Sequence, residues 1–115
     1  MVAAWVPCVA GFGLTLLALA VGAGPIAQDV RYHQFADTRR CCGMPNALDV
    51  LSNAGLMVVA VAGWDAAAAL PPELARAWRV FFAGVGAVAA GSAYYHWAPS
   101  NPRLVWDRLP MTVGF

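Results

Sequence analysis

The chain has no lysine, and only 11% of its 115 residues are charged. Its seven positive charges are all arginine, and six acidic residues leave a net charge of +1. A protein that binds nucleic acid needs a clustered basic face, and no basic run of that kind occurs, so we expect no nucleic-acid partner. An average soluble domain carries about 25% charged residues, so the shortage of charge also argues against a soluble enzyme.

Cysteine is scarce as well, with three residues at Cys8, Cys41 and Cys42. Neighbouring cysteines rarely form a disulfide with each other, the number is odd, and no CxxC pattern occurs. Neither a disulfide framework nor a zinc ribbon is therefore indicated. We interpret these thiols as small hydrophobic or redox-silent side chains.

Apolar residues are abundant, at 61% of the chain with a mean hydropathy of +0.62. They fall into four runs, over residues 3–23, 45–63, 77–97 and 104–115. About 20 apolar residues cross the hydrocarbon core of a bilayer, so the first three runs are long enough and the fourth is too short. We predict an all-α, polytopic membrane bundle with three complete transmembrane helices and the start of a fourth. These runs form a single partial domain in the lipid bilayer.

The first run has a rival interpretation as a signal peptide, because Ala18-Leu19-Ala20 resembles a cleavage site. No positive charge precedes the run, however, and it is long for such a segment, so we favour a retained helix. The connections between runs give a weak orientation signal. Cytoplasmic loops are enriched in arginine, which places the N-terminus outside. This prediction depends on Arg31, Arg39 and Arg40 in the first connection, Arg76 and Arg79 in the second, and Arg103 in the third.

The most informative polar residues are Ser92, His96 and Asp107. Ser92 and His96 are four residues apart at the end of the third run, so they share one face of a helix. Asp107 lies in the fourth run, and the short connection 98–102 lets it return toward His96. Polar groups at membrane depth usually face the protein interior and often mark chemistry.

Each of these three residues suits a role in metal-dependent hydrolysis. A neutral imidazole such as His96 is a good zinc ligand, and zinc activates water and polarises a carbonyl. The Asp107 carboxylate can take a proton from that water or orient it. The Ser92 hydroxyl can donate to the oxyanion that forms when a carbonyl is attacked. The competing interpretation is an aromatic belt at the membrane interface, formed by Tyr94, Tyr95, Trp97 and Trp106.

Two further polar sets are weaker candidates. Asn46, Asp49 and Asn53 form one stripe on the second apolar run, which indicates either helix packing or one wall of the same cavity. Asp37 and neighbouring carbonyls in the first connection have the oxygen atoms that calcium prefers. His33 is a single loop histidine, and we interpret it as solvated.

The stretch GSAYYHWAPSNPRLVWDRLPMT resembles the alkaline ceramidase family, within a superfamily of seven-helix membrane hydrolases that includes the adiponectin-type receptors. That superfamily has a Ser-x-x-x-His pattern at the end of one helix, matched by Ser92 and His96, and an aspartate near the start of the next, matched by Asp107. In ceramidases a Leu-Pro-Met sequence follows, matched by residues 109–111. The segment FADTRRCCGMPNALDVLSNAG also looks like bacterial members, and the resemblance covers residues 32–111.

The resemblance implies a zinc-dependent enzyme that hydrolyses the amide bond of a ceramide, giving a sphingoid base and a fatty acid. It implies that His96 binds Zn²⁺ and that Ser92 and Asp107 are catalytic. The other two zinc ligands of the family are an His-x-x-x-His pair on its last helix, which this sequence lacks. Relatives also carry Ca²⁺ on acidic residues before the second run, but that pattern is not clearly preserved here, so Ca²⁺ stays doubtful.

We therefore expect a C-terminally truncated member of this family in the bacterial inner membrane, with run 3–23 as an additional helix outside the shared core. Such a piece is inactive alone and needs further C-terminal helices to complete its site. The alternative is a non-catalytic membrane protein, either receptor-like or one that only packs with partner helices.

Overall fold

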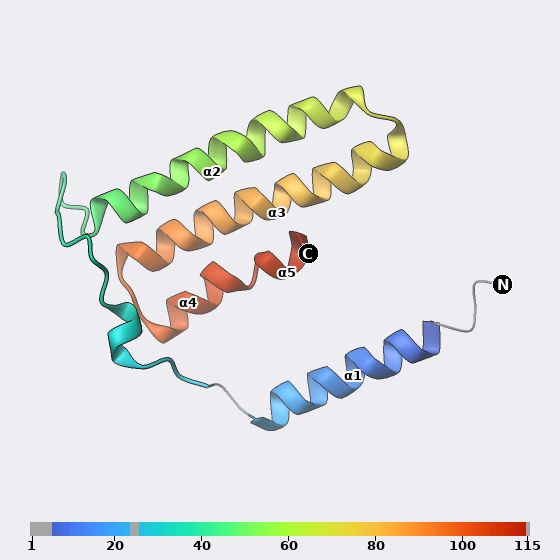
Figure 1. The fold of residues 1–115 in the computed structure, drawn as a ribbon, viewed down its shortest axis with the longest axis horizontal. Helices are drawn as coiled ribbons and strands as arrows, with labels where there is room; N and C mark the ends of the chain where they lie inside the picture. Colours follow the sequence, from blue (N-terminus) through green and yellow to red (C-terminus); the bar gives the residue numbers. More distant parts are fainter. Residues whose placement is uncertain (1–5, 24–25, 115) are drawn as a thin grey trace.

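The computed structural model describes residues 6–23 and 26–114, and every regular element in these ranges is a helix (Figure 1). The all-α prediction is therefore confirmed. Helices α2 (Ala47–Ala66) and α3 (Pro72–Trp97) form an antiparallel hairpin, joined by the short 3-10 helix η2 (Ala67–Ala69). Helices α4 (Asn101–Arg108) and α5 (Met111–Gly114) then return along α3.

The helices are arranged in a single layer. The molecule measures 58 × 44 × 16 Å, and a helix with its side chains is about 10–12 Å across, so the shortest dimension holds one helix. Figure 1, which looks down the shortest axis, shows helix α1 (Val6–Ala23) separated sideways from the other helices, and within the described residues it packs against no other helix. The 3-10 helix η1 (Val30–His33) lies in the segment that leads from α1 to α2.

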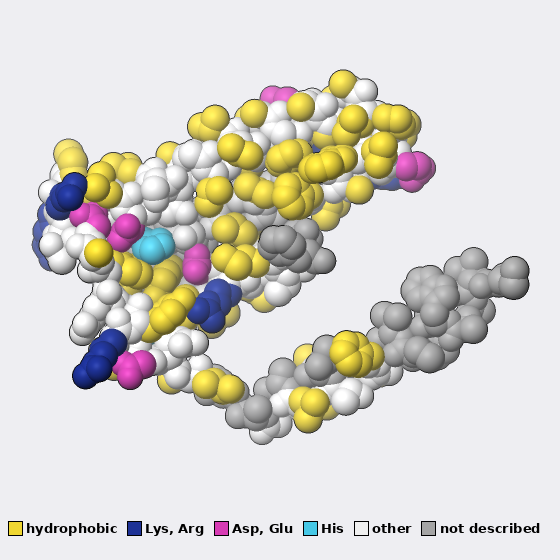
Figure 2. Space-filling view, viewed as in Figure 1, with side chains coloured by type: hydrophobic (Ala, Val, Ile, Leu, Met, Phe, Trp, Pro, Cys, Tyr) yellow, Lys and Arg dark blue, Asp and Glu magenta, His cyan; other side chains and the backbone are white. Residues whose placement is uncertain are grey.

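Two helical segments, Ala47–Ala69 and Pro72–Trp97, are long and apolar enough to cross a membrane by length and composition. In the most apolar 18-residue stretch of each segment, only 22% and 17% of the residues are buried inside the protein, so most of their apolar side chains face outward. Figure 2 shows apolar side chains spread along α2 and α3, with charged side chains mainly toward the ends of the helices. The large exposed side chains on α2 include Leu48, Leu51, Val58, Val59 and Val61.

Small residues let α2 and α3 approach each other closely. Ala60 and Ala89 are buried, and a Cβ atom added to Gly86 would lie 3.4 Å from the Ala60 Cβ. Close backbone approach increases dispersion contacts between helices, which replaces the hydrophobic driving force where lipid surrounds both.

The helices extend beyond the apolar runs that predicted them. Helix α2 continues three residues beyond Gly63, and α3 begins at Pro72 rather than at Ala77, so the predicted connection 64–76 shrinks to a short turn. The Pro71-Pro72 pair lies at a break between helices: η2 ends at Ala69, Pro71 is the N-cap of α3, and Pro72 occupies the first turn of α3, where its missing N–H costs nothing. Hydropathy marks what lipid can cover, whereas caps and prolines set where a helix ends.

The fourth run also differs from its prediction. Its helix begins at Asn101 rather than at residue 104, and it is divided into α4 and α5 at Leu109 and Pro110. Pro110 cannot donate to the carbonyl four residues earlier, which belongs to Trp106. The interruption leaves that carbonyl available for a contact outside its own helix.

Candidate functional site

The three predicted site residues lie where α3 ends and α4 begins to run back along it. Ser92 and His96 occupy the last turns of α3, Asp107 occupies the last turn of α4, and all three are half-buried. The two helices pack against each other, so the predicted return of Asp107 toward α3 does occur. Figure 2 shows a histidine with acidic side chains nearby at this end of the molecule.

The closest approach between these helices is at Gly91. A Cβ atom at this position would overlap the backbone carbonyl of Trp106 and would lie 3.3 Å from the backbone nitrogen of Asp107. Only glycine permits this approach, because every other residue carries a Cβ. Gly91 precedes Ser92, so the same contact fixes the Asp107 backbone beside the turn that carries Ser92.

The three side chains are near one another without forming a connected network. In the ranges 6–23 and 26–114, no hydrogen bond or ion pair joins Ser92, His96 and Asp107. The Nδ1 atom of His96 is buried and has no hydrogen-bond partner. A buried imidazole nitrogen without a partner is costly in an apolar setting, and it is available to a metal ion or another ligand.

The loop histidine His33, which the sequence predicts to be solvated, packs against this site. A hydrogen bond of 2.8 Å joins His33 Nδ1 and the Tyr95 hydroxyl, with its direction set by the histidine tautomer. Phe35 lies between the two neighbours on α3, with ring centroids 5.5 Å from Tyr95 and 4.5 Å from His96. His33 is therefore half-buried rather than solvated, and no spacing rule in the sequence links it to residues about 60 positions away.

Of the four residues in the predicted aromatic belt, three are exposed and one is buried. Tyr95 is only 2% exposed, so it belongs to the interior of the site and not to the lipid interface. Tyr94, Trp97 and Trp106 are 48%, 47% and 57% exposed, as an interfacial position requires.

Asn46 connects the start of α2 to the end of α3. Its side-chain Nδ2 donates a hydrogen bond of 2.8 Å to the backbone carbonyl of His96. Farther along the predicted polar stripe, Asn53 is buried and donates to the carbonyl of Asp49 in its own helix at 2.9 Å. These contacts favour helix packing over a cavity wall as the role of the stripe.

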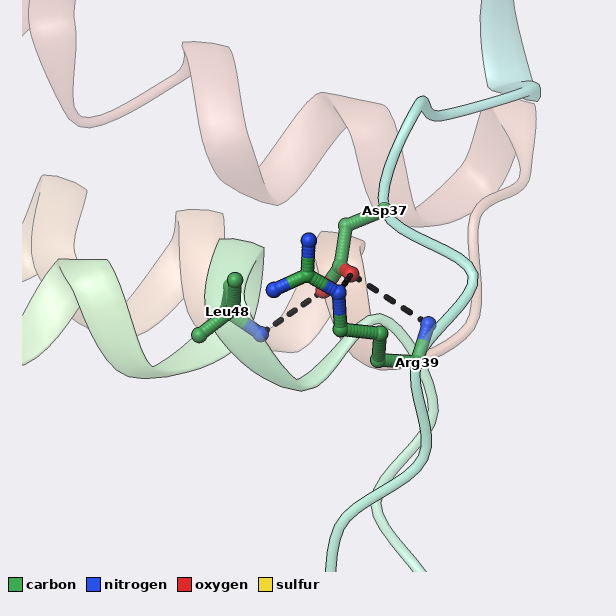
Figure 3. Close-up of polar contacts among 3 residues, drawn as sticks. All are labelled: Asp37, Arg39 and Leu48. Atoms are coloured by element: carbon green, nitrogen blue, oxygen red, sulfur yellow. Dashed lines mark hydrogen bonds and ion pairs between the residues drawn. The ribbon is translucent and has the colours of Figure 1, made fainter.

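Asp37 caps the N-terminus of α2 (Figure 3). Its Oδ2 accepts a hydrogen bond of 2.8 Å from the Leu48 N–H, and its Oδ1 accepts one of 3.2 Å from the Arg39 N–H. The Leu48 N–H is the main cause that lowers the pKa of Asp37 below its ordinary value of 3.8, with Arg39 adding to it and burial opposing it. The carboxylate oxygens considered for calcium thus already accept backbone hydrogen bonds.

Two arginines of α4 each contact a tyrosine outside that helix. Arg108 donates a hydrogen bond of 2.6 Å to the Tyr32 hydroxyl, and the Arg103 guanidinium lies 4.2 Å from the centre of the Tyr94 ring. An open, mainly apolar groove of about 710 Å³ runs between α3 and the α4–α5 segment beside these contacts. Its lining includes Ala87, Gly91, Tyr94, Trp106, Leu109 and Pro110.

Donor atoms for a metal ion are few at this site. In the described part of the chain, no group of three or more His, Cys, Asp or Glu side chains is placed to hold a metal ion. His96 offers one free nitrogen, and a catalytic zinc usually takes three protein ligands. The described residues therefore do not by themselves fit a catalytic zinc site.

No protein-family model matches this chain, and no curated protein or solved structure matches it. The likeness to alkaline ceramidases thus depends on the Ser-x-x-x-His, Asp and Leu-Pro-Met elements and on the segment FADTRRCCGMPNALDVLSNAG.

Proposed function

We propose that the chain forms part of a zinc-dependent membrane hydrolase that cleaves the amide bond of a ceramide-like lipid. The observation that carries the proposal is the packing of Gly91 against Trp106, which holds Asp107 beside the turn that bears Ser92. The buried, unpartnered Nδ1 of His96 on the same end of α3 supports a ligand at this place. The products would be a sphingoid base and a fatty acid.

In this proposal each polar residue has a separate role. The Asp107 carboxylate orients the attacking water and takes its proton. The Ser92 hydroxyl donates a hydrogen bond to the oxygen of the scissile carbonyl as negative charge develops on it. His96 would provide one ligand to a zinc ion that polarises the carbonyl and activates the water, and the other ligands of a catalytic site would have to come from outside the described residues.

The surroundings of the site suit a lipid substrate. The groove of about 710 Å³ between α3 and the α4–α5 segment has mainly apolar walls, and its lining includes Gly91, the residue before Ser92. An acyl chain lying in this groove would bring its amide carbonyl toward the end of α3. We further propose that α1 is a third membrane helix, that α4 and α5 begin a fourth, and that the protein resides in the bacterial inner membrane.

Metal content and amide hydrolysis test the proposal directly. Protein expressed from the complete gene and purified in detergent is analysed for zinc and assayed for fatty-acid release from a ceramide. We expect zinc in the wild type and its loss in His96→Ala. Asp107→Asn should slow turnover by about 10²–10⁴-fold, and Ser92→Ala by about 10²–10³-fold, with zinc retained in both.

Matched variants separate the site from general damage. His33→Ala removes the other histidine and should keep zinc, while Ser52→Ala and Asp65→Asn alter exposed residues of α2 and should keep full turnover. Zinc-free wild type, or full zinc content in His96→Ala, would contradict the role of His96. Wild-type turnover in Asp107→Asn would remove Asp107 from the mechanism.

The second candidate is a non-catalytic membrane protein that only packs with partner helices. One observation favours it, since within the described residues no hydrogen bond connects Ser92, His96 and Asp107. Stable, folded protein that contains no zinc and releases no fatty acid from any ceramide tested would support this candidate.

A further inference from the structure

A tight turn precedes α2 and carries two adjacent cysteines and a methionine, with the sequence Cys41-Cys42-Gly43-Met44. The Cys41 N–H donates to the Met44 carbonyl at 3.0 Å, and the Met44 N–H donates to the Cys41 carbonyl at 2.9 Å. The two central residues have positive φ angles of 52° and 81°, as in a type I′ turn. The backbone of this four-residue segment is therefore closed on itself by its own hydrogen bonds.

Cys42 adopts a conformation that side chains other than asparagine or aspartate seldom take. A residue with a Cβ in the left-handed region costs of order 1–3 kcal/mol, and it persists only where the surroundings determine it. In this turn, the left-handed conformation of Cys42 brings the sulfur atoms of Cys41 and Cys42 close together. The Sγ atoms of Cys41 and Cys42 are 3.8 Å apart, and both side chains are exposed.

Met44 lies on the same face of the turn as Cys41. The two residues form an isolated antiparallel bridge and exchange both of its backbone hydrogen bonds. Residues directly opposite each other in an antiparallel pair project their side chains to the same side. The turn thus places two thiols and a thioether within a short stretch of chain.

The spacing of the two thiols matches that of two ligands on one metal ion. Two sulfurs bound at about 2.3 Å, with an angle between tetrahedral and trigonal, lie about 3.8–4.0 Å apart. The observed 3.8 Å between the Sγ atoms of Cys41 and Cys42 is at this distance. The two thiols therefore need little rearrangement to bind a single ion.

We propose that the turn Cys41–Met44 binds one Cu(I) ion through the thiolates of Cys41 and Cys42 and the thioether of Met44. Binding forms two Cu–thiolate bonds and one Cu–thioether bond and releases the two thiol protons, with no change of oxidation state. The site uses none of Ser92, His96 and Asp107 and does not depend on the hydrolase proposal.

The donor set selects Cu(I) over harder ions. Thiolate and thioether ligands favour Cu(I), whereas structural zinc takes four ligands from Cys and His. The nearby carboxylate of Asp37 accepts hydrogen bonds from the Leu48 and Arg39 backbone N–H groups. Within the described residues no third His, Cys, Asp or Glu joins the cysteine pair.

Anaerobic titration tests the site. The full chain in detergent competes for Cu(I) with a coloured Cu(I) chelator, which gives both stoichiometry and affinity. We expect one Cu(I) per chain, with the affinity lowered by more than about 100-fold in Cys41→Ser and Cys42→Ser and by about 10-fold in Met44→Leu. Cys8→Ser alters the other cysteine and should bind like the wild type.

Three outcomes would overturn the proposal. The first is unchanged Cu(I) affinity in Cys41→Ser, and the second is half an ion per chain, which indicates bridging between two copies. The third is Zn(II) bound so tightly that Cu(I) cannot displace it. Cys41 and Cys42 are exposed and the half-buried Met44 lies in the same turn outside the helices, so circular dichroism should give the same helix content for each variant. If a serine variant changes the helix content, Cys41→Ala and Cys42→Ala replace it in the comparison.

Discussion

Gly91 of α3 lies directly against the backbone carbonyl of Trp106 in α4. Pro110 has no N–H to donate to this carbonyl, so the helix that contains Trp106 leaves it unpaired at that position. The contact couples two separate features of the sequence, Gly91 within α3 and Pro110 after α4. Together they determine how near Asp107 lies to the end of α3.

Gly91→Ala should separate α3 from α4. The added Cβ meets backbone rather than a flexible side chain, so we expect the free energy of unfolding to fall by about 1–3 kcal/mol. Gly55→Ala on α2 is the matched control, because nothing lies within 4 Å of its new Cβ, and alanine should there gain up to about 1 kcal/mol of helix stability. Denaturant unfolding in detergent measures both variants. Equal stability changes in the two variants would refute the close contact.

Asn46 should stabilise the end of α3 through its side chain. The His96 carbonyl is among the last of its helix and lacks an intrahelical partner, so losing the Asn46 Nδ2 donor should cost about 0.5–1.5 kcal/mol. Asn46→Gly isolates this loss, since glycine tolerates the φ of 48° at this position.

Asn46→Ala should destabilise the protein more than Asn46→Gly. Alanine loses the same hydrogen bond and in addition must adopt a left-handed conformation, which costs about 1–2 kcal/mol. Thermal unfolding of the two variants beside the wild type gives both contributions. If Asn46→Gly unfolds at the wild-type temperature, the hydrogen bond to His96 contributes nothing.

Asp37 should make stability depend on acid pH. The folded-state pKa of its carboxyl is lowered, mainly by the Leu48 N–H, so the stabilisation is complete above the ordinary value of 3.8 and disappears as pH falls through the lower folded value. Unfolding measured between about pH 5 and pH 2 should show this loss in the wild type and less of it in Asp37→Asn.

Arg39→Gln is the control for this pH effect. The charge of Arg39 is a smaller cause of the lowered pKa than the Leu48 N–H, so most of the acid-dependent loss should remain in this variant. Arg39 Nε lies 3.6 Å from Asp37 Oδ1, and a pH profile as flat as that of Asp37→Asn would mean that this ion pair, and not the helix cap, dominates.

The Tyr95 hydroxyl should hold the loop that contains His33. Tyr95→Phe keeps the ring packed but leaves the half-buried His33 Nδ1 without its partner, which should cost about 1–3 kcal/mol. Tyr94→Phe is the matched control, because the Tyr94 side chain is about half exposed and its ring still contacts Arg103. A double-mutant cycle with His33→Ala should give a coupling energy for the Tyr95 pair, and zero coupling would contradict the contact.

The sequence predicts the helical class well because the class depends on the composition of whole apolar runs and not on single residues. Uncharged runs of sufficient length can satisfy their backbone groups in lipid only as helices, and α2 and α3 follow from that rule. Their ends were predicted less well, since Trp64, Asp65 and Glu73 are polar or interfacial residues that a helix still accommodates outside the hydrocarbon. Leu109 and Pro110 divide the fourth run, which its composition did not indicate.

The candidate site was predicted in part for a similar reason. Ser92 and His96 share a helix face by periodicity, and the short connection to α4 brings Asp107 back toward them. His33 and Phe35 were missed because a loop has no period that relates it to a distant helix. Only the folded chain places His33 on Tyr95.

The loop contacts also decide when the site is completed during synthesis. The α2–α3 hairpin joins neighbouring segments, so it can close as soon as both helices leave the ribosome. The bonds His33–Tyr95, Gln28–Asn101 and Arg108–Tyr32 span 62, 73 and 76 residues. The His33–Tyr95 contact must wait for the end of α3, and the contacts of Asn101 and Arg108 must wait for α4, because closing so long a loop is slow and yields nothing until both partners exist. The end of the molecule that carries Ser92, His96 and Asp107 is thus expected to be the last part of the described chain to become ordered, after the hairpin that supports it.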